Sequence, residues 1–348
     1  MKKTRNLENI LPIYKIENNC LLSRKGDITL AFELKLPEIF TLSGDDFESL
    51  HQTWIKAIKS LPNHTVIHKQ DWFMESSYKA DFSKTDQSFL SRSSERYFNE
   101  RPYLDHQSYL FITKKPDGRR GASTLVSNLV KASIVPDQTV NSKILDGLLD
   151  KAGQFVKILA DSGYLELRRM ADEELVSTKE KAGLLERYCY LLQPGESPVL
   201  KDLEIGTDLK IGNNHCQLFT LADVQDLPAL CGPRITFDKY STDKTKFSVC
   251  FASLLGQLLP CDHIFNQYII IEDAQATIKK LESKQRRLQS LSAYSRENAL
   301  SHNATNAFLN EAIGQQRTAV KAHFNVLTWS ADQGKAKEVR NTVSSALS

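Results

Sequence analysis

Five basic side chains crowd one short stretch of the sequence. In "IKKLESKQRRLQSL" the apolar residues recur at helical spacing, and the cations are Lys279, Lys280, Lys284, Arg286 and Arg287. A helix that carries several cations can contact successive phosphates of a nucleic acid. The alternative is a solvated helix face, on which the long basic side chains cover their apolar neighbours. We favour the solvated face because no interleaved aromatic residues accompany the cations, and nucleic-acid binding stays open.

A triphosphate-binding P-loop requires the pattern G-x-x-x-x-G-K-[ST]. Backbone amides surround the phosphates there, while the lysine and the hydroxyl reach phosphate and magnesium. The pair Gly334-Lys335 fails this pattern, since Trp329 stands at the first glycine position and Ala336 at the hydroxyl position. Residues 117–123, "DGRRGAS", lack the lysine and the strand-to-helix context, so we interpret them as a loop. The sequence therefore predicts no nucleotide site in these 348 residues.

Three small groups combine the residue types that bind metals. They are His64 with His68, Cys261 with Asp262 and His263, and His215 with Cys216. None has further ligands at a matching interval, so no metal site is predicted. A Cys-His hydrolase stays open as an alternative, because nucleophile and base need only meet in space. The apolar neighbours of Cys216, Cys231 and Cys250 favour a core role instead. We therefore predict neither enzyme activity nor a cofactor for this chain.

Length and composition are those of an ordinary globular protein. A chain of 348 residues exceeds what one growing core accommodates, which favours two or three subdomains. The share of hydrophobic residues is 41% and that of charged residues 25%. A net charge of +3 is too small to identify a partner, because charge acts on binding only where it is concentrated.

The N-terminus and the cysteines indicate a cytoplasmic protein. The opening "MKKTRNLENILPIYKIENN" has no uninterrupted apolar core of an export signal. No run of about 18 apolar residues would span a bilayer. The six cysteines show no C-x-x-C spacing, which is typical of reduced core thiols.

The first 115 residues alternate between strand and helix patterns. The clearest strand is residues 26–37, where apolar residues occupy every second position, and Lys25-Gly26-Asp27 joins it to residues 20–22 in a hairpin. Ser43 to Asp46 reads as a capping box that starts a helix ending before Pro62. A strand over 64–73, a helix over 89–98 and a strand over 106–115 follow. This order suits a layer in which two helices cover one sheet face.

The pattern changes twice in the rest of the chain. A turn-rich connection over 116–140 precedes a helix over 144–159 and a second helix over 171–192, which we expect to pack as a pair. A second mixed region then begins. It contains a hairpin around Gly212, strands at 247–251 and 268–273, one long helix or two with a bend over 273–319, a strand over 322–330 and a helix over 336–347.

These patterns predict the α+β class. We expect two mixed sandwich-like subdomains, ferredoxin-like in their order of strands and helices, joined by a helical segment. The predicted boundaries are 1–115 for the first subdomain, 116–205 for the connection and helical pair, and 206–348 for the second subdomain. The chain stops directly after an amphipathic helix, so we also expect a further segment after residue 348.

Four stretches, in this order, carry a resemblance to a known family: "LSRKGDITLAFELKLPE" (22–38), "LHQTWIKAIKSLPNHTVIHKQDWF" (50–73), "RYFNERPYLDHQSYLFIT" (96–113) and "AHFNVLTWSADQGKAKEVRNTVSSAL" (322–347). The chain resembles the N-terminal region of the TraG-family conjugation ATPases, the Bacteroides-type branch of the VirB-type ATPases of type IV secretion systems. The resemblance runs through most of the chain and is least diagnostic over residues 116–260.

The resemblance implies a RecA-like motor beyond residue 348, where ATP and magnesium would bind and hydrolysis would power conjugative DNA transfer. For this chain it implies a non-catalytic docking or adaptor module between that motor and the secretion machinery. The module would be cytoplasmic and peripherally associated with the inner membrane, and full-length relatives commonly form a homo-hexamer. The alternative function is a stand-alone nucleic-acid-binding protein that uses the basic helix 279–287.

Overall fold

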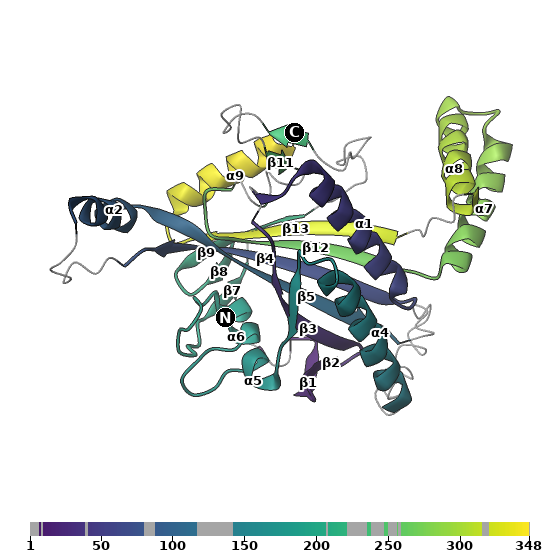
Figure 1. The fold of residues 1–348 in the computed structure, drawn as a ribbon. Helices are drawn as coiled ribbons and strands as arrows, with labels where there is room; N and C mark the ends of the chain where they lie inside the picture. Colours follow the sequence, from purple (N-terminus) through teal and green to yellow (C-terminus); the bar gives the residue numbers. More distant parts are fainter. Residues whose placement is uncertain are drawn as a thin grey trace.

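The computed structural model describes residues 7, 10–38, 41–79, 88–116, 142–206, 208–220, 235–237, 247–249, 256, 259–314 and 320–347. Strands from both ends of this range meet in one large antiparallel sheet, and helices lie on both of its faces (Figure 1). The predicted α+β class is confirmed.

Two hairpins begin the sheet. β1 (Ile13–Glu17) and β2 (Cys20–Ser23) join through Asn18 and Asn19, both at positive φ, a conformation that Asn tolerates better than most residues. β2 then turns through Gly26, at φ 80°, into β3 (Ile28–Lys35), which confirms the predicted hairpin. The turn between β1 and β2 is also hydrogen-bonded to Asp172, which is far away in the sequence. The Asn19 N–H donates to Asp172 Oδ1 at 2.8 Å, and Asn19 Oδ1 accepts from the Asp172 N–H at 2.9 Å.

The helix α1 (Gly44–Ser60) begins at the predicted capping box. Ser43 Oγ accepts from the Asp46 N–H, and Asp46 Oδ2 accepts from the Ser43 N–H at 2.8 Å. The helix stops at Leu61, immediately before Pro62. Its inner face packs on the sheet through Ala57, which belongs to a hydrophobic core, and through Leu50, Trp54 and Ile58, which are partly buried against that core.

The second helix that we predicted to cover this face does not do so. α2 (Phe89–Asn99) has no buried residue and lies at the far end of the long pair β4 (Thr65–Ser77) and β5 (Pro102–Lys114) (Figure 1). α4 (Ser142–Ala160) takes the place instead, and its buried stripe is Leu148, Ala152, Phe155 and Leu159. The Trp54 and Phe155 rings meet edge to face at 6.1 Å, which joins α1 to α4.

The helical pair predicted for this region is also corrected. One helix over 171–192 was expected, but the structure has two short ones, α5 (Asp172–Leu175) and α6 (Leu184–Tyr190). Between them the chain folds back on itself, and a Cβ on Gly183 would come within 2.4 Å of the Val176 carbonyl carbon. This close backbone approach requires glycine at the start of α6 and prevents a continuous helix. β6 (Glu166–Arg169), between α4 and α5, pairs with β3.

The last third of the chain supplies the other half of the sheet. β7 (Leu203–Ile205), β8 (Leu209–Ile211) and β9 (Asn214–Thr220) form a meander with the predicted turn at Gly212. β10 (Ile235–Phe237) and β11 (Phe247–Val249) pair separately. β12 (His263–Ile271) and β13 (Val320–Ser330) are joined by two helices packed side by side, α7 (Ala274–Leu291) and α8 (Arg296–Gly314). The chain then forms α9 (Gln333–Leu347).

The described strands of the large sheet run in the order β1-β2-β3-β5-β4-β12-β13-β9-β8-β7, with β6 beside β3. β4 pairs with β12 from Thr65 opposite Ile271 to Phe73 opposite His263, so the sheet is continuous between the two predicted subdomains. The boundaries at 115 and 205 stay a prediction, because a sheet can run through two cooperative units.

The two faces of the sheet carry different cores. Ile67 points to the face covered by α1 and α4, where Leu30 and Leu110 are also fully buried. α9 covers the same face over β12 and β13 through Val343. Trp72, five residues after Ile67, points to the opposite face, which α5 and α6 cover. The strand period of two residues accounts for this division.

Candidate interaction surfaces and the pocket beneath α1

The five basic residues singled out in the sequence all lie on the exposed side of α7. Asp273 caps this helix by accepting from the N–H groups of Gln275 and Ala276. The partly or fully buried positions include Ile278, Leu281, Gln285 and Leu288. The exposed positions include Lys279, Lys280, Lys284, Arg286 and Arg287. A solvated basic face is therefore present, as the helical spacing predicted.

The α7–α8 hairpin stands away from the sheet at one end of the molecule (Figure 1). Its two helices pack through a small core that includes Leu288, Leu309 and Ala312. The tip between them exposes large apolar side chains, since Tyr294 is 86% exposed and Leu291 and Leu300 are exposed too. Exposed apolar groups on a projecting element mark a surface suited to contact with another macromolecule.

A second projection lies at the opposite end of the sheet in Figure 1. Residues 74–77 of β4 pair with 102–105 of β5 beyond the last β4 residue that pairs with β12, and α2 lies at their tip. Phe89 is 81% exposed and Leu90 75%, and Tyr97 and Phe98 are also exposed. We refer to residues 74–79 and 88–105 as the α2 arm. It offers an aromatic surface, whereas the sequence pattern predicts that the helix over 89–98 covers the sheet.

A buried polar cluster surrounds Asp71 on the α1 face of the sheet. The Asp71 carboxylate pairs with Lys69 and lies 3.0 Å from His106 Nε2, and it accepts from Ser108 Oγ at 2.8 Å. Burial alone raises the pKa of Asp71, but the Lys69 charge and the hydrogen bonds from His106 and Lys69 hold it well below its usual range. Ser108 donates to the carboxylate rather than to a histidine. In a catalytic triad the hydroxyl is hydrogen-bonded to the histidine, so the arrangement of Ser108, His106 and Asp71 is not that of a triad.

Of the residues weighed as metal ligands, His263, Asp262 and His68 have other hydrogen-bond partners. His263 nitrogens lie 2.7 Å from the backbone oxygens of Cys261 and Gly256, and Asp262 Oδ1 accepts from the Glu75 N–H. His68 Nε2 lies 2.8 Å from Asn266 Oδ1. Among the described residues, no group of three or more His, Cys, Asp or Glu could hold a metal ion.

The cysteines that can be placed are at least half-buried. Cys20 and Cys216 are buried, and Cys189 and Cys261 are partly so. Burial raises the pKa of the Cys216 and Cys261 thiols to about 11, which disfavours the nucleophilic thiolate. Cys231, Cys250 and the 117–123 loop lie outside the described residues.

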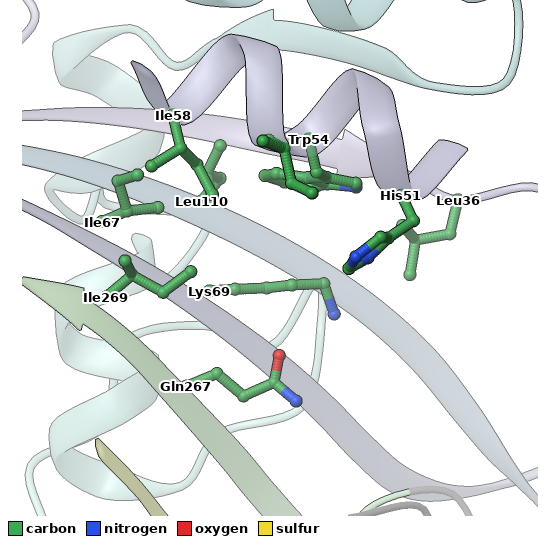
Figure 2. Close-up of a pocket in the computed structure, with 10 residues that line it drawn as sticks. Leu36, His51, Trp54, Ile58, Ile67, Lys69, Leu110, Gln267 and Ile269 are labelled. Carbon is green, nitrogen blue, oxygen red and sulfur yellow. The ribbon is translucent and has the colours of Figure 1, made fainter. Parts of the chain in front are cut away.

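A cavity of about 340 Å³ lies between α1 and the sheet (Figure 2). Trp54, Ile55 and Ile58 of α1 form its roof, and side chains of β4, β5 and β12 form its floor. Figure 2 shows the aliphatic floor toward one end and three polar head groups toward the other. The complete lining is Leu36, His51, Trp54, Ile55, Ile58, Ile67, Lys69, Leu110, Gln267 and Ile269. The sequence contained no local signal for this pocket, because its walls come from residues more than two hundred positions apart.

Within the part of the chain that the structure describes, no helix combines the length and the apolarity needed to cross a membrane.

Comparison with known proteins gives one family match. Residues 1–52 match the family model described as "Domain of unknown function, B. Theta Gene description (DUF3875)". The matched segment includes the three strands β1 to β3 and the first half of α1. No curated protein matches the chain.

Proposed function

We propose that this chain is the non-catalytic N-terminal region of a TraG-family conjugative-transfer ATPase. In this role it docks the motor to the type IV secretion machinery at the inner membrane. ATP and magnesium would bind in the motor beyond residue 348 and not in this chain. A hexameric assembly would follow from the motor, as in the family that the sequence resembles.

The observation that carries the proposal is the pair of projections at opposite ends of one sheet. The α2 arm and the α7–α8 hairpin both expose large apolar side chains, such as Phe89 and Tyr294. A closely packed sheet moves as a stiff body, because protein interiors have low compressibility. A stiff body with a contact surface at each end suits a part that transmits displacement between a motor and a fixed partner.

The family match supports the Bacteroides-type branch of the proposed family, but it gives no support to ATP hydrolysis. Its description names B. Theta, in keeping with the Bacteroides-type proteins that the four sequence stretches resemble. The described domain has no assigned function, and it covers residues 1–52 only.

The proposal is tested in donor cells that express the full-length protein. One variant carries Phe89→Ser with Leu90→Ser in the α2 arm, and another carries Leu291→Ser with Tyr294→Ser at the hairpin tip. Each is expected to lose co-purification with a secretion component, and mating frequency is expected to fall. Tyr14→Ser, at an exposed position of β1 outside both projections, is the matched control. Unchanged partners and mating in both variants would contradict the docking role.

Nucleic-acid binding is the second candidate function, and the exposed basic side of α7 favours it. Cations that contact phosphates give a binding constant that falls with salt, by a log-log slope of about −0.9 per contact on duplex DNA. The test is a gel-shift titration of the parent and of Lys284→Glu with Arg286→Glu and Arg287→Glu, each at two salt concentrations. If the parent binds and the triple variant does not, this candidate stands. Absence of binding, or binding without a salt slope, removes it.

A further inference from the structure

The pocket beneath α1 has an apolar body and a polar end. Ile58 of α1 faces Ile67, Leu110 and Ile269 of the sheet, and these four side chains enclose the body (Figure 2). A volume of about 340 Å³ is close to the lower limit of the roughly 300–1,000 Å³ found for small-molecule sites. The space therefore suits a short ligand with an apolar chain or ring.

The polar end gathers hydrogen-bond donors. Lys69 of β4 and Gln267 of β12 are direct partners across the strand pair, so both side chains rise from the same face of the sheet. His51 lies on α1, one turn before Ile55, and lines the same pocket as Lys69; Figure 2 shows its ring at the same end of the pocket as the Lys69 amine. The Lys69 ammonium has three N–H groups, and the contact with Asp71 Oδ2 needs only one of them.

From this arrangement we propose that the pocket binds a small amphipathic carboxylate, with its apolar chain beneath α1 and its carboxylate at Lys69, Gln267 and His51. Asp71 does not line the pocket, and its charge is shared among Lys69, His106 and Ser108. A cationic head would lie against the Lys69 ammonium and be repelled. A carboxylate there accepts charge-assisted hydrogen bonds, which are about twice as strong as neutral ones. The proposal is independent of the docking role.

Isothermal titration calorimetry with decanoate tests the proposal on the whole chain, below the micelle concentration. Saturable binding at one site is expected for the parent. Ile58→Trp fills the apolar body and is expected to abolish this binding. Lys69→Met removes the cation and should weaken decanoate by about tenfold, the equivalent of one charge-assisted hydrogen bond. Binding of decanol, which has no charge, should be similar in the parent and in Lys69→Met.

Three controls keep the result decisive. Lys59→Met removes a cation from the exposed side of α1 and should leave decanoate binding unchanged. Lys69→Arg keeps the charge and should restore most of the affinity, which separates lost recognition from lost folding. A nuclear Overhauser effect between the ligand chain and the Trp54 indole places the ligand in the pocket. The proposal is overturned by the absence of saturable binding, by unimpaired binding in Ile58→Trp, or by equal losses in Lys59→Met and Lys69→Met.

Discussion

His68 illustrates how the fold sets the chemistry of a single residue. Its ring is stacked between Phe111 at 5.3 Å and Tyr268 at 4.2 Å. An amide oxygen can only accept, so His68 Nε2 is the donor in its contact with Asn266 Oδ1, which also accepts from Gln70 Nε2. Burial lowers the pKa of His68 from 6.5 to about 4, with the Asn266 hydrogen bond opposing the shift. The imidazole is therefore neutral in the folded protein at neutral pH.

A depressed histidine pKa predicts a defined loss of stability in acid. The unfolded chain binds the proton below about pH 6.5, whereas the folded chain binds it only below about pH 4. The stabilisation is thus fully present above pH 6.5 and is lost as pH falls through 4, by about 3 kcal/mol. Urea unfolding of the parent and of His68→Phe across this range measures the loss. The gap between the two free energies of unfolding should shift with pH, and a constant gap would contradict the prediction.

At the scale of one element, α1 depends on its cap. Ser43→Ala removes the side-chain acceptor for the Asp46 N–H and should lower the free energy of unfolding by about 1 kcal/mol. Ser49→Ala, at an exposed interior position of the same helix, is the matched control and should have little effect. Thermal or urea unfolding distinguishes the two. Equal effects of both changes would mean that the cap does not determine where this helix begins.

The α7–α8 hairpin should open more readily than the sheet that it leaves. Its own core contains few buried apolar side chains, whereas β4 and β12 are paired on both sides by other strands. Local opening has a low free energy where few apolar contacts are lost. Hydrogen exchange followed by mass spectrometry should show fast exchange over 274–314 and slow exchange over 65–73 and 263–271. Equal protection would indicate that the hairpin is held by contacts beyond its own.

At the scale of the whole molecule, the pairing of β4 with β12 joins strands from the first and the last third of the sequence. Nine register pairs run from Thr65–Ile271 to Phe73–His263, at the centre of the sheet. We therefore expect one cooperative unfolding transition, with the same urea midpoint by tryptophan fluorescence and by far-ultraviolet circular dichroism. Two separate midpoints would instead support the subdomain boundaries predicted at 115 and 205.

The amino-acid sequence alone determined the local elements. The alternation in β3, the cap at Ser43, the stripe of α4 and the exposed cations of α7 were all predictable, because strand period, capping and helical spacing involve residues only a few positions apart. The error over 171–192 also lies within a short stretch: the chain folds back so that Gly183 packs against the backbone of residues 175–177, and the helical spacing of the apolar residues does not reveal this close approach.

Tertiary structure alone decided how those elements meet. It placed α4 rather than α2 over the sheet, and it brought His68 to Asn266, which lies 198 positions away. The pocket beneath α1 depends on the same step, since Lys69 and Gln267 become neighbours only when β4 pairs with β12. Strand order depends on the burial of both faces of the sheet. Because that burial involves residues from the whole chain, no short stretch of the sequence predicts the order.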